Sequence, residues 1–176
     1  AYAGTMRLGM KTNTGDIHGE PVAGFVPRAS FFVSRDGSSS VEHSDSQITI
    51  DDARSARREF LGDVFLTEPR YCAVRREGSA EYEIADTGEH KPILVHVWDF
   101  DVSNQENGIG SPAADTANLS FSLCATKGII VRALISDFGD ALGCGAVLDS
   151  CRRTHVGNFK VEDAVKFADL LDMDIG

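Results

Sequence analysis

Two basic residues stand at the start of a predicted helix, where positive charge is electrostatically unfavourable. The stretch TKGIIVRALISDFGDALGCGA, residues 126–146, contains Lys127 and Arg132, and the peptide dipoles already make a helix start partly positive. The apolar residues recur with the helical period and are followed by two glycines as a stop signal: Val131, Leu134, Ile135, Phe138, Leu142, Gly143 and Gly145. Cations at such a position make chemical sense if a carboxylate or a phosphate completes the group.

Arg132 is expected at the edge of the buried side of this helix, because it lies about 100° around the axis from Val131. A partly desolvated guanidinium requires an acid that accepts two of its hydrogen bonds. The alternative that composition leaves open is an ordinary structural ion pair with one of the 27 Asp and Glu residues. A buried charge left without its partner costs roughly 3–5 kcal/mol, so Arg132→Ala should destabilise the protein.

A second basic group occurs in CRRTHVGNF and consists of Arg152, Arg153 and His155. It can be a solvated surface run or an RNA contact. The RNA interpretation is favoured only if Arg75, Arg76 and Lys127 lie on the same side, because clustered charge makes the electrostatic footprint. The net charge of -10 argues against indiscriminate nucleic-acid binding.

We expect no metal site. Asp16, His18 and Glu20 alternate in DIHGE and were considered as ligands, but alternation in a glycine turn is more typical of solvated side chains. The four cysteines fit no zinc spacing: Cys72, Cys124, Cys144 and Cys151. They predict reduced, mostly buried thiols in a reducing compartment.

The 176 residues are predicted to form one soluble domain that neither crosses a membrane nor is secreted. No apolar run approaches the roughly 18–20 residues of a membrane span, and the first residues show no secretory pattern. Strands are predicted at 2–10, 92–100 and 119–125. Helices are predicted at 49–61, with Thr49 as N-cap and Asp52 three residues on, at about 131–142 and at 161–172.

Three segments resemble the TruB-type RNA pseudouridine synthase family. YAGTMRLGMKTNTGDIHGE is similar to the family segment in which a tyrosine precedes an RLG strand and a TxTxDxxG turn. FLGDVFLTEPRYCAVRREGSAEYEIADTGE is similar to the family's FxG, PxYSAxK, G and YExAxxG series. CATKGIIVRALISDFGDALGCGAVLDSCRRTHVGNF is similar to CSKGTYIRxLxxDxGxxLGxGAxxxxLRRxxxGxF without a gap. The resemblance leaves out the stretches at about 21–46 and 103–117, which we predict to be insertion loops.

The resemblance implies an α+β fold with a twisted, largely antiparallel sheet flanked by helices, incomplete at its N-terminus. Residues 1–176 would form a partial TruB-like pseudouridine synthase domain without the family's C-terminal RNA-binding extension. Members of the family isomerise uridine to pseudouridine in the T-loop of tRNA or a similar stem-loop, without cofactor or metal. They flip the target base out of its stack, which carries a penalty of a few kcal/mol.

The resemblance also implies roles for individual residues. Arg132 matches the arginine that pairs with the catalytic aspartate, and Tyr2 matches the tyrosine that packs against the flipped base. Lys127 matches the lysine of the third motif. The predicted RNA-binding residues are Lys127, Arg132, Arg152, Arg153, His155, Arg75, Arg76 and Tyr82.

Three departures from the family pattern weaken the expectation of activity. The catalytic aspartate lies in a GxxDxxATG motif upstream of the tyrosine strand, and the sequence begins after that point. Ile130 replaces an active-site tyrosine and cannot donate a hydrogen bond. Asp86 replaces an arginine and is unfavourable beside phosphate.

We therefore predict an RNA-binding domain that is inactive by itself and serves as a non-catalytic component of a ribonucleoprotein, such as an organellar ribosome or its assembly machinery. The alternative is part of an active synthase whose aspartate comes from a missing N-terminal segment or a partner chain. A protein-binding domain that no longer contacts RNA is a third interpretation. The expected partners are a tRNA or rRNA stem-loop and a protein chain that completes the domain, inside the cell and in mitochondria or another organelle.

Overall fold

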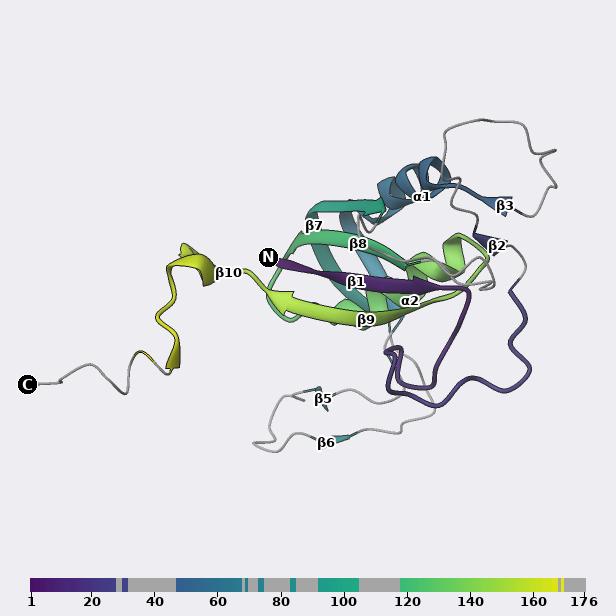
Figure 1. Cartoon of the computed structure of the whole chain (residues 1–176), viewed down its shortest axis with the longest axis horizontal. Helices are drawn as coiled ribbons and strands as arrows, with labels where there is room; N and C mark the ends of the chain where they lie inside the picture. The colour runs from purple at the N-terminus through teal and green to yellow at the C-terminus, as the bar shows by residue number, and fades with distance from the viewer. Residues whose placement is uncertain are drawn as a thin grey trace, which may run out of the picture.

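The computed structural model describes residues 1–27, 30–31, 47–67, 69, 73–74, 83–84, 92–104, 118–167 and 169. Its centre is a five-stranded sheet with the strand order β4-β7-β8-β1-β9 (Figure 1). The strands are β1 (Tyr2–Leu8), β4 (Gly62–Thr67), β7 (Pro92–Asn104), β8 (Asn118–Ala125) and β9 (Ala146–Arg153). Every neighbouring pair is antiparallel. The predicted strands and the α+β fold class are confirmed.

The helical elements α1 (Ile50–Ala56), η1 (Arg57–Phe60) and α2 (Val131–Ala141) pack against one face of this sheet. The core between them is built around Phe100 and Phe138, whose rings meet edge to face at 5.3 Å. The stripe predicted for α2 is confirmed, since Val131, Leu134 and Ile135 are buried together with Phe138. Burial of this stripe, rather than intrinsic propensity, is what stabilises so short a helix.

The start of α1 follows from its sequence. Thr49 is the N-cap, and its side chain accepts a hydrogen bond from the Asp52 N–H at 3.2 Å. The Asp52 carboxylate accepts the Thr49 N–H at 2.8 Å, which completes a reciprocal capping box. The helical conformation ends at Phe60. Gly62 begins β4 with φ 80°.

The smaller elements are three two-stranded pairs and a 3₁₀ turn. β2 (Ser30–Phe31) pairs with β3 (Gln47–Ile48), β5 (Ala73–Val74) with β6 (Glu83–Ile84), and β10 (His155–Val156) with β11 (Phe159–Lys160), and η2 covers Val161–Asp163. Figure 1 shows that the chain from β10 onward extends away from the sheet. No helix among the described residues is long and apolar enough to cross a membrane.

The helix predicted at 161–172 is not continuous: Phe167 and Asp169 are helical, residues 164–166 are not, and residues 168 and 170–172 lie outside the described part of the chain. After η2 the backbone of Ala164 is extended, with φ −78° and ψ 133°, and residues 164–166 are not helical. The apolar residues of this segment remain outside the core, with Val165 55% and Phe167 76% exposed. A short helix whose apolar side finds no packing surface is marginal in water, which explains the difference.

The structure partly corrects the expectation for the cysteines, and it leaves most of the expected insertion loops outside the described residues. Cys144 is buried and Cys124 half-buried, but Cys151 is exposed, so the thiols are not uniformly internal. Cys72 lies outside the described residues. β7 continues to Asn104, and most of the two proposed insertion loops also lies outside the described part of the chain.

The close approach of α2 to β9 depends on Gly139. A Cβ atom at this position would lie 2.1 Å from the Ala146 nitrogen and 2.5 Å from the Ala146 Cβ. Backbone atoms at such a distance cannot give way without moving β9 relative to the helix.

We predict that Gly139→Ala lowers the free energy of unfolding by about 1–3 kcal/mol, as expected for overpacking. In a helix without this contact the same change would stabilise by roughly 0.5–1 kcal/mol. The measurement is urea denaturation, with Ser136→Ala in the same helix as control. Equal or higher stability of Gly139→Ala would contradict the packing described here.

Candidate functional site

The start of α2 is not capped by a side chain. Ile130 is the N-cap residue, with φ −96° and ψ 96°, and it makes no side-chain capping hydrogen bond. Its carbonyl accepts from the Ala133 N–H at 3.0 Å and the Leu134 N–H at 3.3 Å. The first turn contains no acidic residue. The positive end of the helix dipole therefore adds to the charge of Arg132.

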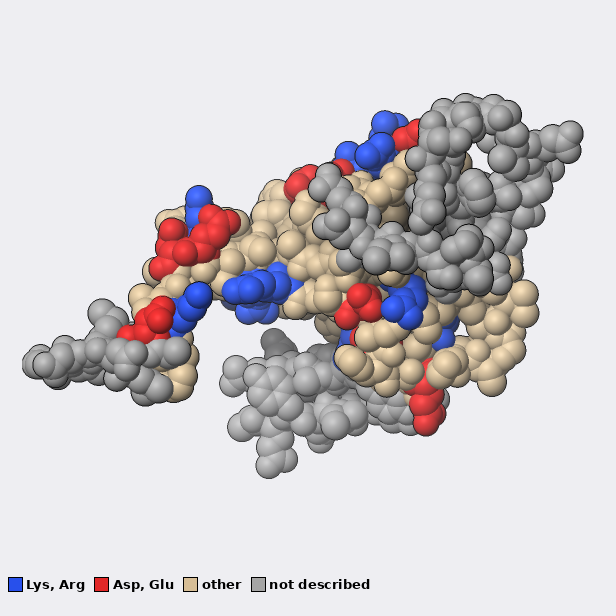
Figure 2. All heavy atoms as spheres, viewed as in Figure 1, with Lys and Arg blue, Asp and Glu red and all other residues tan. Residues whose placement is uncertain are grey.

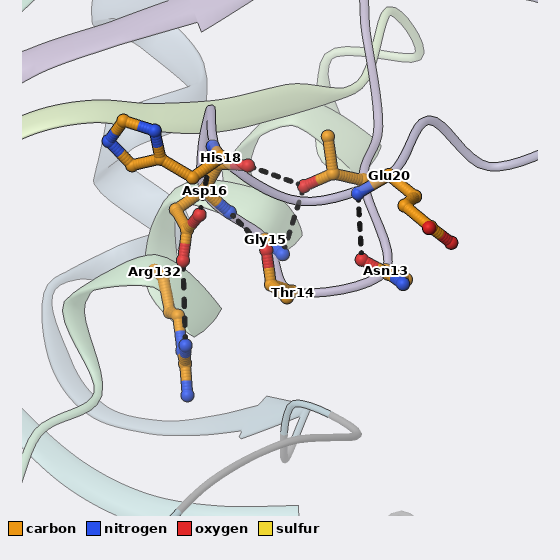
Figure 3. Close-up of polar contacts among 8 residues, drawn as sticks. Asn13, Thr14, Gly15, Asp16, His18, Glu20 and Arg132 are labelled. Carbon is orange, nitrogen blue, oxygen red and sulfur yellow. Dashed lines mark hydrogen bonds and ion pairs between the residues drawn. The ribbon is translucent and has the colours of Figure 1, made fainter.

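Asp16 supplies the acid that Arg132 was predicted to require. Its Oδ2 lies 3.5 Å from Nη1 of Arg132, and the two side chains are 28% and 27% exposed (Figure 3). This exposure makes the guanidinium partly desolvated, as predicted, but it is not deeply buried. The cost of breaking the pair should therefore fall below the range for fully buried ions.

The turn after β1 fixes the position of Asp16. The Thr12 hydroxyl donates to the Asp16 carbonyl at 2.7 Å, and Asp16 Oδ1 accepts the His18 N–H at 3.0 Å. The second bond is a local Asx-type turn, which orients the carboxylate without help from distant residues. Asp16 Oδ2 is directed toward Arg132 as a result.

Backbone hydrogen bonds attach this turn to the edge of the sheet. The Ile17 N–H donates to the Leu148 carbonyl at 2.9 Å, and the Leu148 N–H donates to the Gly15 carbonyl at 3.0 Å. Asp16 and Leu148 thereby form a parallel bridge. The strand that carries Leu148 follows α2 in sequence, so the turn, β9 and the helix are held as one unit.

Gly15 provides the backbone conformation of the turn that carries Asp16. Its φ of 78° lies in the left-handed region, which L side chains rarely adopt. A Cβ atom there would lie 3.5 Å from the Arg132 carbonyl oxygen, an ordinary contact distance. The glycine is therefore required by the shape of the turn and not by its distance from α2.

The considered metal site at Asp16, His18 and Glu20 is not formed. Asp16 pairs with Arg132, while the exposed His18 ring and the exposed Glu20 carboxylate lie on either side of the turn and point away from it (Figure 3). Within the described ranges, no group of three or more His, Cys, Asp or Glu side chains is arranged to hold a metal ion.

Tyr2 and the second basic group meet at the opposite end of β1. Tyr2 pairs with Arg153 across β1 and β9, and the guanidinium carbon of Arg153 lies 5.1 Å from the centre of the half-buried tyrosine ring. This distance is within the range of a cation–π contact. The backbone of Ala1 is hydrogen bonded to Thr154 and His155 at 2.9–3.3 Å. The structure therefore brings Tyr2, Arg153 and His155 together.

The remaining predicted RNA contacts are only partly described. Arg152 is exposed on β9 opposite Ala3, and Lys127 is exposed on the turn before α2. Figure 2 shows basic atoms gathered over the part of the sheet that leads to β10. Arg75, Arg76 and Tyr82 lie outside the described residues, so their position relative to Lys127 stays a prediction.

Sequence reasoning did not identify Asp16 as a partner of Arg132. It considered Asp16 as a metal ligand and favoured a solvated turn instead, whereas the structure places the carboxylate beside the guanidinium. The TxTxDxxG turn could have identified this partner. This turn directly follows the tyrosine strand, and the resemblance implies that the arginine pairs with an acid. Ile130, the departure from the family pattern, packs half-buried against the core as an apolar residue can.

Comparisons with known proteins agree with this arrangement. The family described as the C-terminal domain of tRNA pseudouridylate synthase B matches residues 132–175. tRNA pseudouridine synthase B of Burkholderia mallei (strain NCTC 10247) is 34% identical over 173 residues, which cover 97% of this chain and 48% of the relative. The enzyme of the same name from Francisella philomiragia subsp. philomiragia is 27% identical over 176 residues, or 98% and 49% of the two chains.

Solved structures share the fold. A chain in the crystal structure of a Cbf5-Nop10-Gar1 complex superposes with a TM-score of 0.52 at 20% identity, over 97% of this chain and 34% of that chain. A chain in the structure of an H/ACA RNP bound to a substrate RNA containing 2′-deoxyuridine gives the same TM-score at 19% identity, over 97% and 32%.

Over 97% of its length the chain is similar to tRNA pseudouridine synthases of the TruB type. It spans about half the length of the curated relatives that it matches. The resemblance inferred from the three segments is thus confirmed at the level of family and fold.

The Asp16–Arg132 pair should contribute about 1 kcal/mol of coupling energy, because both groups retain access to water. The measurement is a double-mutant cycle of Asp16→Asn and Arg132→Ala by urea denaturation. Lys127→Ala, at an exposed position, is the control and should change stability by less than about 0.5 kcal/mol. Strict additivity of the two changes would mean that the pair is not formed in solution.

Proposed function

We propose that this chain forms the arginine-bearing, RNA-binding part of a pseudouridine synthase site. The observation that carries the proposal is the Asp16–Arg132 pair, which holds a partly desolvated guanidinium at an uncapped helix start. An arginine can bind two carboxylates at once because its guanidinium has five N–H donors. A catalytic aspartate from a GxxDxxATG segment would be the second acid.

The reaction requires that aspartate as its catalytic group. Conversion of uridine to pseudouridine breaks the bond from N1 to the ribose C1′ and forms a bond from C5 to C1′, while C5 releases a proton and N1 takes one up. Asp16 cannot easily replace the missing acid, because the turn and Arg132 engage its two carboxylate oxygens. The 176 residues alone should therefore bind RNA without converting it.

Two features support a tRNA as the substrate: the similarity to tRNA pseudouridine synthases and the basic end of β9. The relatives are tRNA pseudouridine synthases, and a flipped base needs an aromatic or guanidinium surface to stack on. Tyr2 offers an aromatic ring and Arg153 a guanidinium, and the two groups are in contact with each other. We infer that a uridine in a tRNA stem-loop, flipped toward Tyr2, is the substrate.

A second candidate function is a non-catalytic role in a ribonucleoprotein, including an organellar ribosome or its assembly machinery. The observation that favours it is Ile130, which offers no hydrogen-bond donor where the family has a tyrosine and is packed against the core. One solved structure with this fold comes from a Cbf5-Nop10-Gar1 complex, which supports a protein partner.

The two functions can be separated by supplying the missing acid. We predict that a segment carrying GxxDxxATG, fused ahead of Ala1 or added as a separate chain, restores release of tritium from tRNA labelled at uridine C5. Arg132→Lys should lower the rate at least tenfold in this assembly, because lysine lacks the planar two-donor fork. Arg153→Ala should weaken RNA binding without abolishing the chemical step.

The matched control is the same segment with its aspartate changed to asparagine, which should remain inactive. RNA binding without turnover in every assembly would support the non-catalytic role. Absence of both binding and turnover would contradict the proposed function as a whole.

A further inference from the structure

The face of the sheet opposite the helices carries an exposed apolar patch near β4. We call Phe65, Leu94 and Trp98 the β4/β7 patch; they are 70%, 59% and 60% exposed. Phe65 and Leu94 are direct cross-strand partners. Trp98 continues the outward alternation of Leu94 and His96 along β7, directly before the irregularity at Asp99. His96 lies between Leu94 and Trp98 on this face, with its ring 5.4 Å from the Trp98 ring and its Nδ1 2.6 Å from Asp63 Oδ1. The three exposed apolar side chains around this polar pair indicate a docking surface.

The patch adjoins an edge strand. Among the described strands, none lies beyond β4 in the sheet. His96 directs its backbone toward the β8 side, since its carbonyl accepts the Thr126 N–H at 2.9 Å and its N–H donates to Thr126 Oγ1 at 3.2 Å. Asp63 is its antiparallel partner, so the backbone groups of Asp63 and Phe65 point outward from the edge.

The side of β4 that faces the helices is acidic. A hollow of about 550 Å³ lies between β4, η1 and α2, and the helical elements contribute Glu59, Asp137 and Asp140 to its lining. Asp63 and Phe65 of β4 also border it, but the Asp63 carboxylate is paired with His96 Nδ1 at 2.6 Å. Asp137 accepts the outward-pointing Thr67 N–H at 2.7 Å. Burial raises the pKa of its carboxyl, and the Thr67 hydrogen bond opposes part of this shift. A cation in the hollow would compensate the partly desolvated carboxylate, whereas phosphate would be repelled.

Lys11 shows that this acidic region accepts a lysine. Its Nζ lies 2.6 Å from Asp140 Oδ2 at the rim of the hollow. On the open face, Asp99 and Asp101 are exposed, and Asp101 Oδ1 lies 3.5 Å from Arg57 Nε. The surface as a whole combines apolar contacts with negative charge, which excludes RNA as its natural ligand and favours a basic protein segment.

We propose that the edge of β4 binds an extended, basic segment of a partner protein, which adds to the sheet as a further strand. Successive side chains of a strand point to opposite faces. Apolar side chains of the segment would pack on the β4/β7 patch, and the alternating Lys or Arg side chains would enter the acidic hollow. Main-chain hydrogen bonds to Asp63 and Phe65 provide the pairing, as in other cases of β-strand addition. This interaction is independent of the RNA site at Arg132.

Trp98 reports directly on the proposed site, because it is the only tryptophan of the 176 residues. The probe is a blocked ten-residue peptide in which Lys and Val alternate. We predict a saturable blue shift of tryptophan emission, with affinity at least tenfold higher than for a Glu and Val peptide or a Lys and Gly peptide. Hydrogen exchange at the Asp63 and Phe65 amides should slow when the Lys and Val peptide binds.

Variants separate the two parts of the surface. Phe65→Ser should weaken peptide binding at least tenfold through the lost apolar contact. Asp137→Asn retains an oxygen for the Thr67 N–H but removes charge, and should weaken the Lys and Val peptide severalfold. The matched control is Phe159→Ser, since Phe159 is 83% exposed on the β10–β11 hairpin. Circular dichroism confirms folding, and Leu94→Ser replaces Phe65→Ser if the latter does not fold.

Several results would overturn the proposal. The first is that the Lys and Val peptide causes no shift of Trp98 emission. The second is that the Glu and Val peptide binds with equal affinity. The third is that Phe65→Ser and Asp137→Asn both bind the Lys and Val peptide with unchanged affinity. A Trp98 shift with single-stranded RNA in place of the peptide would assign the surface to RNA. Self-association that buries Trp98 in sedimentation experiments without peptide would assign it to a second copy of the chain.

Discussion

A guanidinium at the positive end of a helix is stable only beside an acid, and this requirement explains the arrangement around α2. Asp16 meets it from a turn whose shape requires a glycine and that β9 holds by two backbone hydrogen bonds. The pair thus links the first strand, the last strand of the sheet and the helix between them. A change in any of the three would alter the position of the arginine.

The surface is divided into regions of opposite character, although the total charge is negative. Basic and aromatic side chains meet where β1 and β9 approach β10, and carboxylates surround the hollow beside β4. These regions lie at opposite edges of the same sheet. A nucleic acid and a basic protein could therefore bind at once without competing for the same charges. The net charge of the chain reveals neither the basic region nor the acidic one, because it sums over the whole surface.

Sequence predicted those features that depend on local pattern. The apolar period located α2, the Thr49 capping box located α1, and the β-rich runs located β1, β7 and β8, whereas β4 and β9 were not predicted. The partner of Arg132 depended instead on a bridge between Asp16 and Leu148, which no local pattern contains. The predicted C-terminal helix is interrupted at residues 164–166, because periodicity cannot reveal whether a core surface exists for the apolar side.

The interior position of β1, between β8 and β9, has a consequence for how the chain folds. β1 pairs with β8 on one side and β9 on the other, and its Thr5 contacts Ser150, 145 positions away in sequence. Closing so long a loop is slow, and native pairing across it raises the contact order of the domain. During synthesis at the ribosome, β1 must therefore remain without its native partners until β8 and β9 emerge. Its hydrophobic side chains, including Met6 and Leu8, would be natural targets for a chaperone during that interval.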